Sequence, residues 1–65
     1  MTLPLEQARL RAAVLRATGE AARHSEQALR LALRGRLSDA ETHCFRAIEQ
    51  LDTAQASLEQ WRRIR

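Results

Sequence analysis

Apolar side chains along this chain recur every three or four residues, the spacing of an α-helix, in two stretches separated by Gly35. The first stretch, about residues 4–34, consists mostly of strong helix formers and has Pro4 in its first turn. Gly35 is typical of a helix end. The segment Ser38-Asp39-Ala40-Glu41 has the pattern of a capping box and predicts that a second helix covers residues 39–64. We therefore predict an all-α, antiparallel two-helix hairpin that forms a single domain over residues 1–65.

Gly19 is the weakest position of the first predicted helix, because glycine costs about 1 kcal/mol relative to alanine in a helix interior. It allows a kink, a close helix contact, or a break at Thr18-Gly19 that would give three helices. We predict a continuous helix, since the apolar spacing continues in phase across Gly19.

Each predicted helix carries one stripe that could pack against the other helix. In the second helix the stripe has the four-three spacing of a coiled-coil seam and comprises Ala40, Cys44, Ala47, Leu51, Ala54, Leu58 and Trp61. The matching stripe of the first helix comprises Leu15, Thr18, Ala22, Ser25, Leu29 and Ala32. Folding at Arg36 would set Leu29 beside Cys44 and Trp61 opposite Ala12. It would leave His24 and His43 about six residues out of register, too far apart to share a metal ion.

A second apolar stripe on the first helix lies about a quarter turn from the stripe just described. It comprises Leu10, Val14, Ala17, Ala21, Ala28 and Leu31. Because a hairpin covers one stripe per helix, we expect another chain to cover this one. Dimerisation or a partner chain would then complete a four-helix bundle. Phe45 and Ile48, away from the seam of the second helix, are expected to be further partner-binding residues.

Eleven arginines and no lysine give the chain a formal net charge of +3. Five of these arginines form a ridge along the first helix: Arg9, Arg16, Arg23, Arg30 and Arg34. One hypothesis is that the ridge contacts phosphates of RNA or DNA. The alternative is a solvated outer face, where Glu20 and Glu26 pair with arginines on the same helix. We favour the solvated face, because no aromatic residue interleaves with the ridge to stack on bases.

Little in the sequence points to chemistry. It has no glycine-rich phosphate loop and no plausible catalytic set, and one cysteine cannot form an internal disulfide. We expect no enzymatic activity, no cofactor, no metal and no small-molecule substrate. No apolar run approaches the roughly 20 residues of a membrane span, and no signal peptide is visible, so a cytoplasmic location without membrane contact is expected. A 65-residue core has near-zero net stability on its own, which again favours a partner.

Two families resemble this layout. A helix, then Arg34-Gly35, then a helix containing Arg46-Ala47-Ile48-Glu49 resembles the small co-chaperones of type III secretion systems. These are helical hairpins that hold the needle subunit together with a second chaperone. The alternation of small and large residues in the second-helix stripe is similar to that of the repressor-of-primer family, a hairpin dimer that binds RNA. These resemblances imply a small helical adaptor or co-chaperone, with an RNA-binding four-helix-bundle dimer as the alternative.

Overall fold

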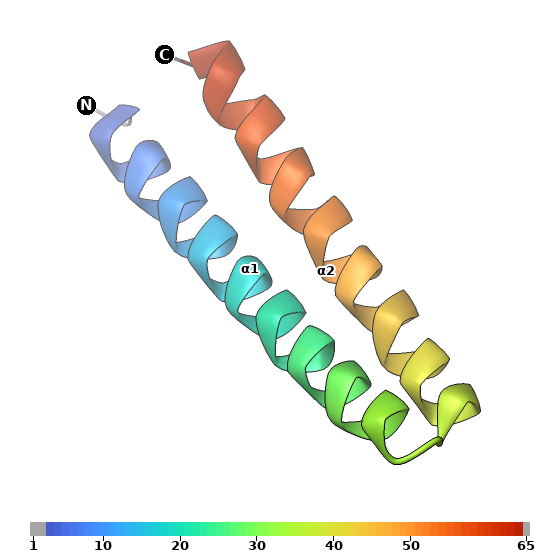
Figure 1. The fold of residues 1–65 in the computed structure, drawn as a ribbon. Helices are drawn as coiled ribbons and strands as arrows, with labels where there is room; N and C mark the ends of the chain where they lie inside the picture. The colour runs from blue at the N-terminus through green and yellow to red at the C-terminus, as the bar shows by residue number, and fades with distance from the viewer. Residues whose placement is uncertain (1–2, 65) are drawn as a thin grey trace.

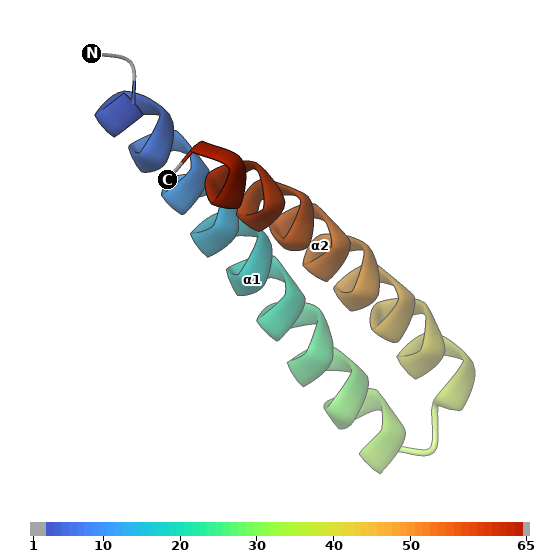
Figure 2. The ribbon, with the colours of Figure 1, turned by 90° about the horizontal axis from the view of Figure 1, so that it is seen from above.

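The computed structural model describes residues 3–64, which form two long helices and a short connection. Helix α1 spans Leu3–Leu33 and helix α2 spans Leu37–Ile64. They run antiparallel side by side, with both chain ends at the open end of the hairpin (Figures 1 and 2). The molecule is a rod whose principal extents are 52 × 14 × 11 Å. The prediction of an all-α two-helix hairpin is confirmed.

Gly35 ends α1, as predicted. Its φ of +78° lies in the left-handed region that glycine adopts without a steric penalty. The Gly35 N–H donates to the carbonyl of Ala32 (2.9 Å), and the Arg36 N–H donates to that of Leu31 (2.9 Å). These two bonds define a Schellman motif, which satisfies carbonyls that the helix end would leave unpaired.

Helix α2 begins two residues before the predicted start. The Ala40 N–H donates to the carbonyl of Arg36 at 3.0 Å, so Arg36 precedes the first turn and Ser38 lies within it. The predicted capping box is therefore wrong. The Arg36 guanidinium donates to the Asp39 carboxylate at 2.5 Å instead, and Asp39 is an acidic residue in the first turn, where the helix dipole favours negative charge.

Helix α1 is continuous through Gly19, as predicted. Gly19 is exposed, and a Cβ placed there would meet no atom within 4 Å. The residue therefore marks neither a break nor a close helix contact.

The two helices meet along alanines. The buried hydrophobic residues are Ala17, Ala21 and Ala28 of α1, and Ala40, Ala47 and Ala54 of α2. The prediction that the hairpin leaves the Ala17–Ala21–Ala28 stripe uncovered is wrong, because these side chains are only 3–7% exposed. The stripe expected to face α2 is the exposed one, with Leu15 and Leu29 58% and 60% accessible.

The error has a simple physical origin. On α1 the two stripes have the same four-three spacing, and the exposed stripe lies one residue after the buried one at each step: 14 and 15, 17 and 18, 21 and 22, 28 and 29, 31 and 32. On α2 the alanines of the predicted seam are buried, but Cys44, Leu51 and Leu58 between them are exposed. The positions that alternate with these alanines are instead the partly buried His43, Gln50 and Ser57.

Candidate protein-interaction surface

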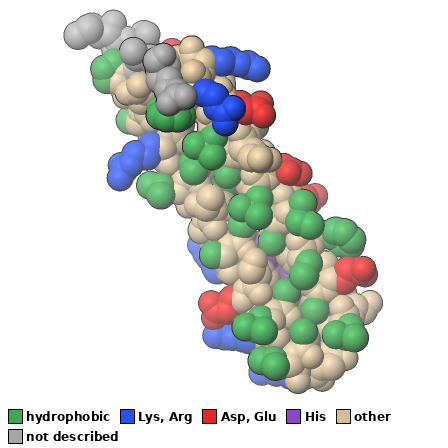
Figure 3. All heavy atoms as spheres, turned by 45° about the horizontal axis from the view of Figure 1, so that its top comes forward, with side chains coloured by type: hydrophobic (Ala, Val, Ile, Leu, Met, Phe, Trp, Pro, Cys, Tyr) green, Lys and Arg blue, Asp and Glu red, His purple; other side chains and the backbone are tan. Residues whose placement is uncertain are grey.

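One long side of the hairpin carries most of the exposed large apolar side chains. They occupy the positions just after the seam in both helices, and in an antiparallel pair these positions lie on the same side. Figure 3 shows hydrophobic side chains gathered over both helices on one side of the rod, densest in the half nearer the turn. We call this side the apolar face and define it by Leu15, Leu29, Leu37, Ile48, Leu51 and Leu58.

A groove at the open end confirms that the two helices share this face. Leu15 of α1 and Leu58 of α2 line the same groove, which has a volume of about 400 Å³. Trp61 lines it as well and is 37% exposed, so this side chain is partly covered at the mouth of the hairpin. On the α1 side the other lining residues are Gln7, Leu10, Arg11 and Val14. The groove sets Trp61 beside the part of α1 between Gln7 and Leu15, and Ala12, the predicted neighbour of Trp61, does not line it.

The predicted partner-binding residues of α1 are largely occupied within the hairpin. Ala17, Ala21 and Ala28 are buried, while Leu10, Val14 and Leu31 are half-buried along the same seam. They therefore do not form the exposed surface that a partner would meet.

The two further predicted residues on α2 are accessible. Phe45 is 60% exposed and Ile48 is 54% exposed. Ile48 lies on the apolar face and Phe45 at its outer margin, by their helical positions. Cys44, predicted to be buried beside Leu29, is exposed and lies on the apolar face, one turn before Ile48 and two turns before Leu51.

The seam contains one polar pair that the sequence analysis missed. His24 of α1 and His43 of α2 are both partly buried, and their Nδ1 atoms lie 2.9 Å apart. The rings stack with centroids 5.1 Å apart and an interplanar angle of 29°. The prediction that the two histidines are six residues out of register is wrong. That prediction assumed a hairpin folded symmetrically about Arg36. In the structure α2 is shifted along α1 relative to that arrangement, and the shift brings the two imidazoles together.

The histidine pair has a structural consequence. Alanines that repeat along both helices permit several registers of nearly equal packing, whereas a polar pair at seam positions is satisfied in only one of them. The His24–His43 contact therefore favours the observed register over its neighbours.

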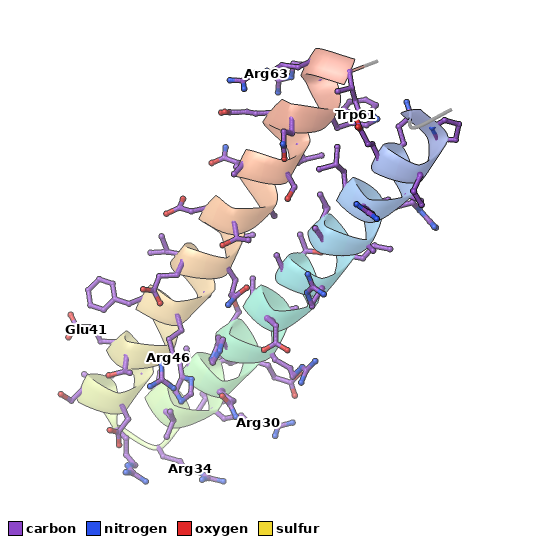
Figure 4. All side chains as sticks on the ribbon, turned by 180° about the vertical axis from the view of Figure 1, so that it is seen from behind. Arg30, Arg34, Glu41, Arg46, Trp61 and Arg63 are labelled. Atoms are coloured by element: carbon purple, nitrogen blue, oxygen red, sulfur yellow. The ribbon has the colours of Figure 1, made fainter. Side chains whose placement is uncertain are left out.

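The arginine ridge lies on the outer flank of α1 and is solvated. Arg23 pairs with Glu20 at 3.1 Å, and Arg30 pairs with Glu26 at 2.5 Å, as the spacing predicts. The arginine side chains of these pairs are 75% and 67% exposed. Figure 4, viewed from behind, shows Arg30 and Arg34 near the closed end of the hairpin, with Arg46 of α2 close by.

The two helices carry opposite net charge. Helix α1 has five arginines and three acidic residues, a balance of +2, whereas α2 has three arginines and five acidic residues, a balance of −2. The basic excess lies on the flank of α1 at Arg9, Arg16, Arg23 and Arg30. Of the acidic residues of α2, Asp52 and Glu59 share the helical position of Phe45 at the outer margin of the apolar face, whereas Glu41 lies on the face at the position of Ile48. The arginine ridge lies one residue, or about 100° around α1, beyond Leu15 and Leu29, and therefore on the side turned away from the apolar face.

Neither helix within residues 3–64 has an apolar stretch long enough to cross a membrane. Within this part of the chain, no three metal-ligating side chains of the His, Cys, Asp and Glu types converge. No protein-family model matches the chain, and no curated protein or solved structure matches it.

Proposed function

We propose that this protein is a non-enzymatic interaction module that binds another helical surface through its apolar face. The observation that carries the proposal is the one-sided distribution of large side chains. Leucines and an isoleucine lie exposed on one side of the rod, while the seam inside the hairpin contains no buried side chain larger than alanine among residues 4–64.

The exposed area of the chain supports this role. The accessible surface is 5235 Å², whereas a compact monomer of 7.4 kDa is expected to expose about 4,200 Å². The excess of roughly 1,000 Å² is comparable to the ~800 Å² that each partner contributes to a standard interface. Two helices, each about 10 Å across, over a 52 Å rod offer a face of that size.

We propose a second copy of this chain as the occupant, because the excess exposed area of one chain matches the share that each partner contributes to a standard interface. If α1 of one copy lies over α2 of the other, the apolar face of each copy covers that of its partner. A two-fold axis parallel to the helices produces this arrangement, with both turns at the same end and antiparallel neighbours throughout. The product is a four-helix bundle in which the apolar faces form the central layer.

A hetero-partner is the other outcome that the experiment must separate. The adaptor or co-chaperone role implied by the resemblance to secretion co-chaperones belongs to this version of the proposal. It would use the same apolar face, with the helices of a different protein in place of the second copy.

The test is the molar mass in solution, measured by light scattering over a range of chain concentrations. The expected mass is twice that of one chain, or about 15 kDa from the 7.4 kDa chain. The variant Leu29→Glu/Leu51→Glu places two charges in the central layer, where burying them without partners costs several kcal/mol. It should be a monomer at concentrations where the wild type is dimeric, and its helix content should become concentration-independent.

The matched control adds the same two charges to the opposite side of the rod. Gln27→Glu/Gln60→Glu changes one exposed residue per helix, both on the polar side, and should leave the dimer intact. A wild-type chain that remains a stable monomer with the apolar face solvated contradicts self-association. Capture of a purified partner by this monomer, abolished by the leucine variant only, would favour the hetero-partner.

The nucleic-acid alternative has weaker support. Two arginines of the ridge, Arg23 and Arg30, already pair with carboxylates of their own helix, which reduces the positive charge available to phosphates. An Arg16→Glu/Arg23→Glu variant separates the two functions. Loss of RNA retention at low salt, with an unchanged dimer, would favour nucleic-acid binding, whereas no retention by the wild type would contradict it.

A further inference from the structure

His24 and His43 offer two imidazole nitrogens to one point between the helices. Their Nδ1 atoms are 2.9 Å apart, and both side chains are only partly buried. Without a metal, one Nδ1 carries the hydrogen and the other accepts it. A neutral imidazole nitrogen is also the commonest metal ligand in proteins. We infer that His24 and His43 form an interhelical site for a divalent transition-metal ion, which binds beside the line that joins the two Nδ1 atoms after the hydrogen shared by the rings has moved, through solvent, to the Nε2 atom of its own ring.

The separation of the two nitrogens indicates which ions fit. Metal–imidazole bonds are about 2.0–2.1 Å long, so two nitrogens 2.9 Å apart subtend an angle of about 90° at a shared ion. This is the angle between neighbouring ligands in square-planar and octahedral complexes, the geometries typical of Cu²⁺ and Ni²⁺. Tetrahedral Zn²⁺ needs a wider angle and hence a longer nitrogen–nitrogen distance.

The rest of the coordination sphere is not supplied by the hairpin. Within residues 3–64 no third His, Cys, Asp or Glu joins the pair, so water or small anions take the remaining positions. Two protein ligands make an exchangeable site rather than a closed structural one. Because one ligand comes from α1 and the other from α2, the ion joins the helices in the half of the seam nearer the turn and fixes their register.

The site predicts that Ni²⁺ stabilises the folded hairpin. Thermal unfolding followed by circular dichroism, with NiCl₂ or CuCl₂ in excess, should show a higher midpoint than in metal-free buffer. At a metal concentration 100-fold above the dissociation constant, the rise is on the order of 10 °C. ZnCl₂ at the same concentration should raise the midpoint less. Equal effects of Zn²⁺ and Ni²⁺ would contradict the 90° geometry.

Two variants identify the ligands. His43→Gln removes one nitrogen but retains a polar side chain of similar length, and it should abolish the rise. Cys44→Ser removes the neighbouring thiol, which is exposed and outside the pair, and should leave the rise unchanged. A rise that persists in His43→Gln, or that disappears in Cys44→Ser, would overturn the assignment.

A measurement on the wild type keeps the test independent of how the variants fold. Electron paramagnetic resonance of the Cu²⁺-loaded protein should show hyperfine coupling to two equivalent imidazole nitrogens at one equivalent of metal per chain. Coupling to a single nitrogen, or no change in the unfolding midpoint with either ion, means that the pair is only a neutral hydrogen bond and refutes the site.

Discussion

The two glycines of this chain allow the same substitution to be made in two opposite backbone settings. Gly19 lies inside α1 with helical geometry, whereas Gly35 ends the helix with a φ of +78°. A Cβ added at either glycine meets no atom within 4 Å. Contacts with neighbours therefore cancel in the comparison, and only backbone conformation distinguishes Gly19→Ala from Gly35→Ala.

The two substitutions should change stability in opposite directions. Alanine at position 19 should add about 1 kcal/mol, the difference between the two residues in a helix interior. Alanine at position 35 must adopt the left-handed conformation, which costs about 1–2 kcal/mol for a residue with a Cβ. Reduced freedom of the unfolded chain offsets this by about 0.4–1 kcal/mol. The net result is a loss of roughly 1 kcal/mol, and the two variants differ by roughly 2 kcal/mol.

Thermal and urea unfolding by circular dichroism measure the difference, with all chains at one concentration so that assembly contributes equally. A change of 1 kcal/mol moves the midpoint of a domain this small by about 4–8 °C, so the two variants should melt on the order of 10 °C apart. Equal midpoints would mean that Gly35 does not hold a left-handed turn. A destabilised Gly19→Ala would mean that α1 is not a regular helix at this position.

Two further predictions concern the surface. The Cys44 thiol is exposed in a single hairpin but would be covered in the dimer. The rate at which a thiol reagent labels Cys44 should therefore fall as the chain concentration rises. A labelling rate that does not depend on concentration would contradict burial of the apolar face. Glu26→Gln removes the carboxylate that pairs with Arg30 at 2.5 Å. It should lower the free energy of unfolding, measured by urea titration, by no more than about 0.5 kcal/mol, and by less at high salt. A loss above about 1 kcal/mol would show that this exposed pair is not an ordinary surface ion pair.

Local sequence signals predicted the helices and their connection well. A residue with φ above zero is needed where α1 ends, and glycine provides it at position 35. Strong helix formers on both sides of Gly19 outweigh its cost of about 1 kcal/mol, so α1 continues. Both features depend on neighbours within one or two turns, and composition and spacing report such short-range effects directly.

The choice of seam could not be predicted from periodicity, because the two candidate stripes of α1 have the same spacing and differ by one residue. What separates them is packing across the hairpin: alanines at 17, 21 and 28 meet alanines at 40, 47 and 54. Residue size was a signal only in the middle of α1, where the alanines at 17, 21 and 28 let the two backbones approach closely, whereas Leu15 and Leu29 would hold them apart. The His24–His43 contact follows from that register, and it could not be found while the seam was misassigned.

The alanine seam and the leucine surface have one physical cause. Two helices that meet through methyl groups lie too close for the larger side chains beside the seam to be covered within the same hairpin, so these project to one side. Six buried alanine methyls contribute on the order of 5 kcal/mol of hydrophobic free energy. Covering the exposed half of each of the six side chains of the apolar face would thus add, per chain, about as much hydrophobic free energy as the six buried alanine methyls contribute. For this reason, we expect the stability of the hairpin to depend on the concentration of whatever binds there.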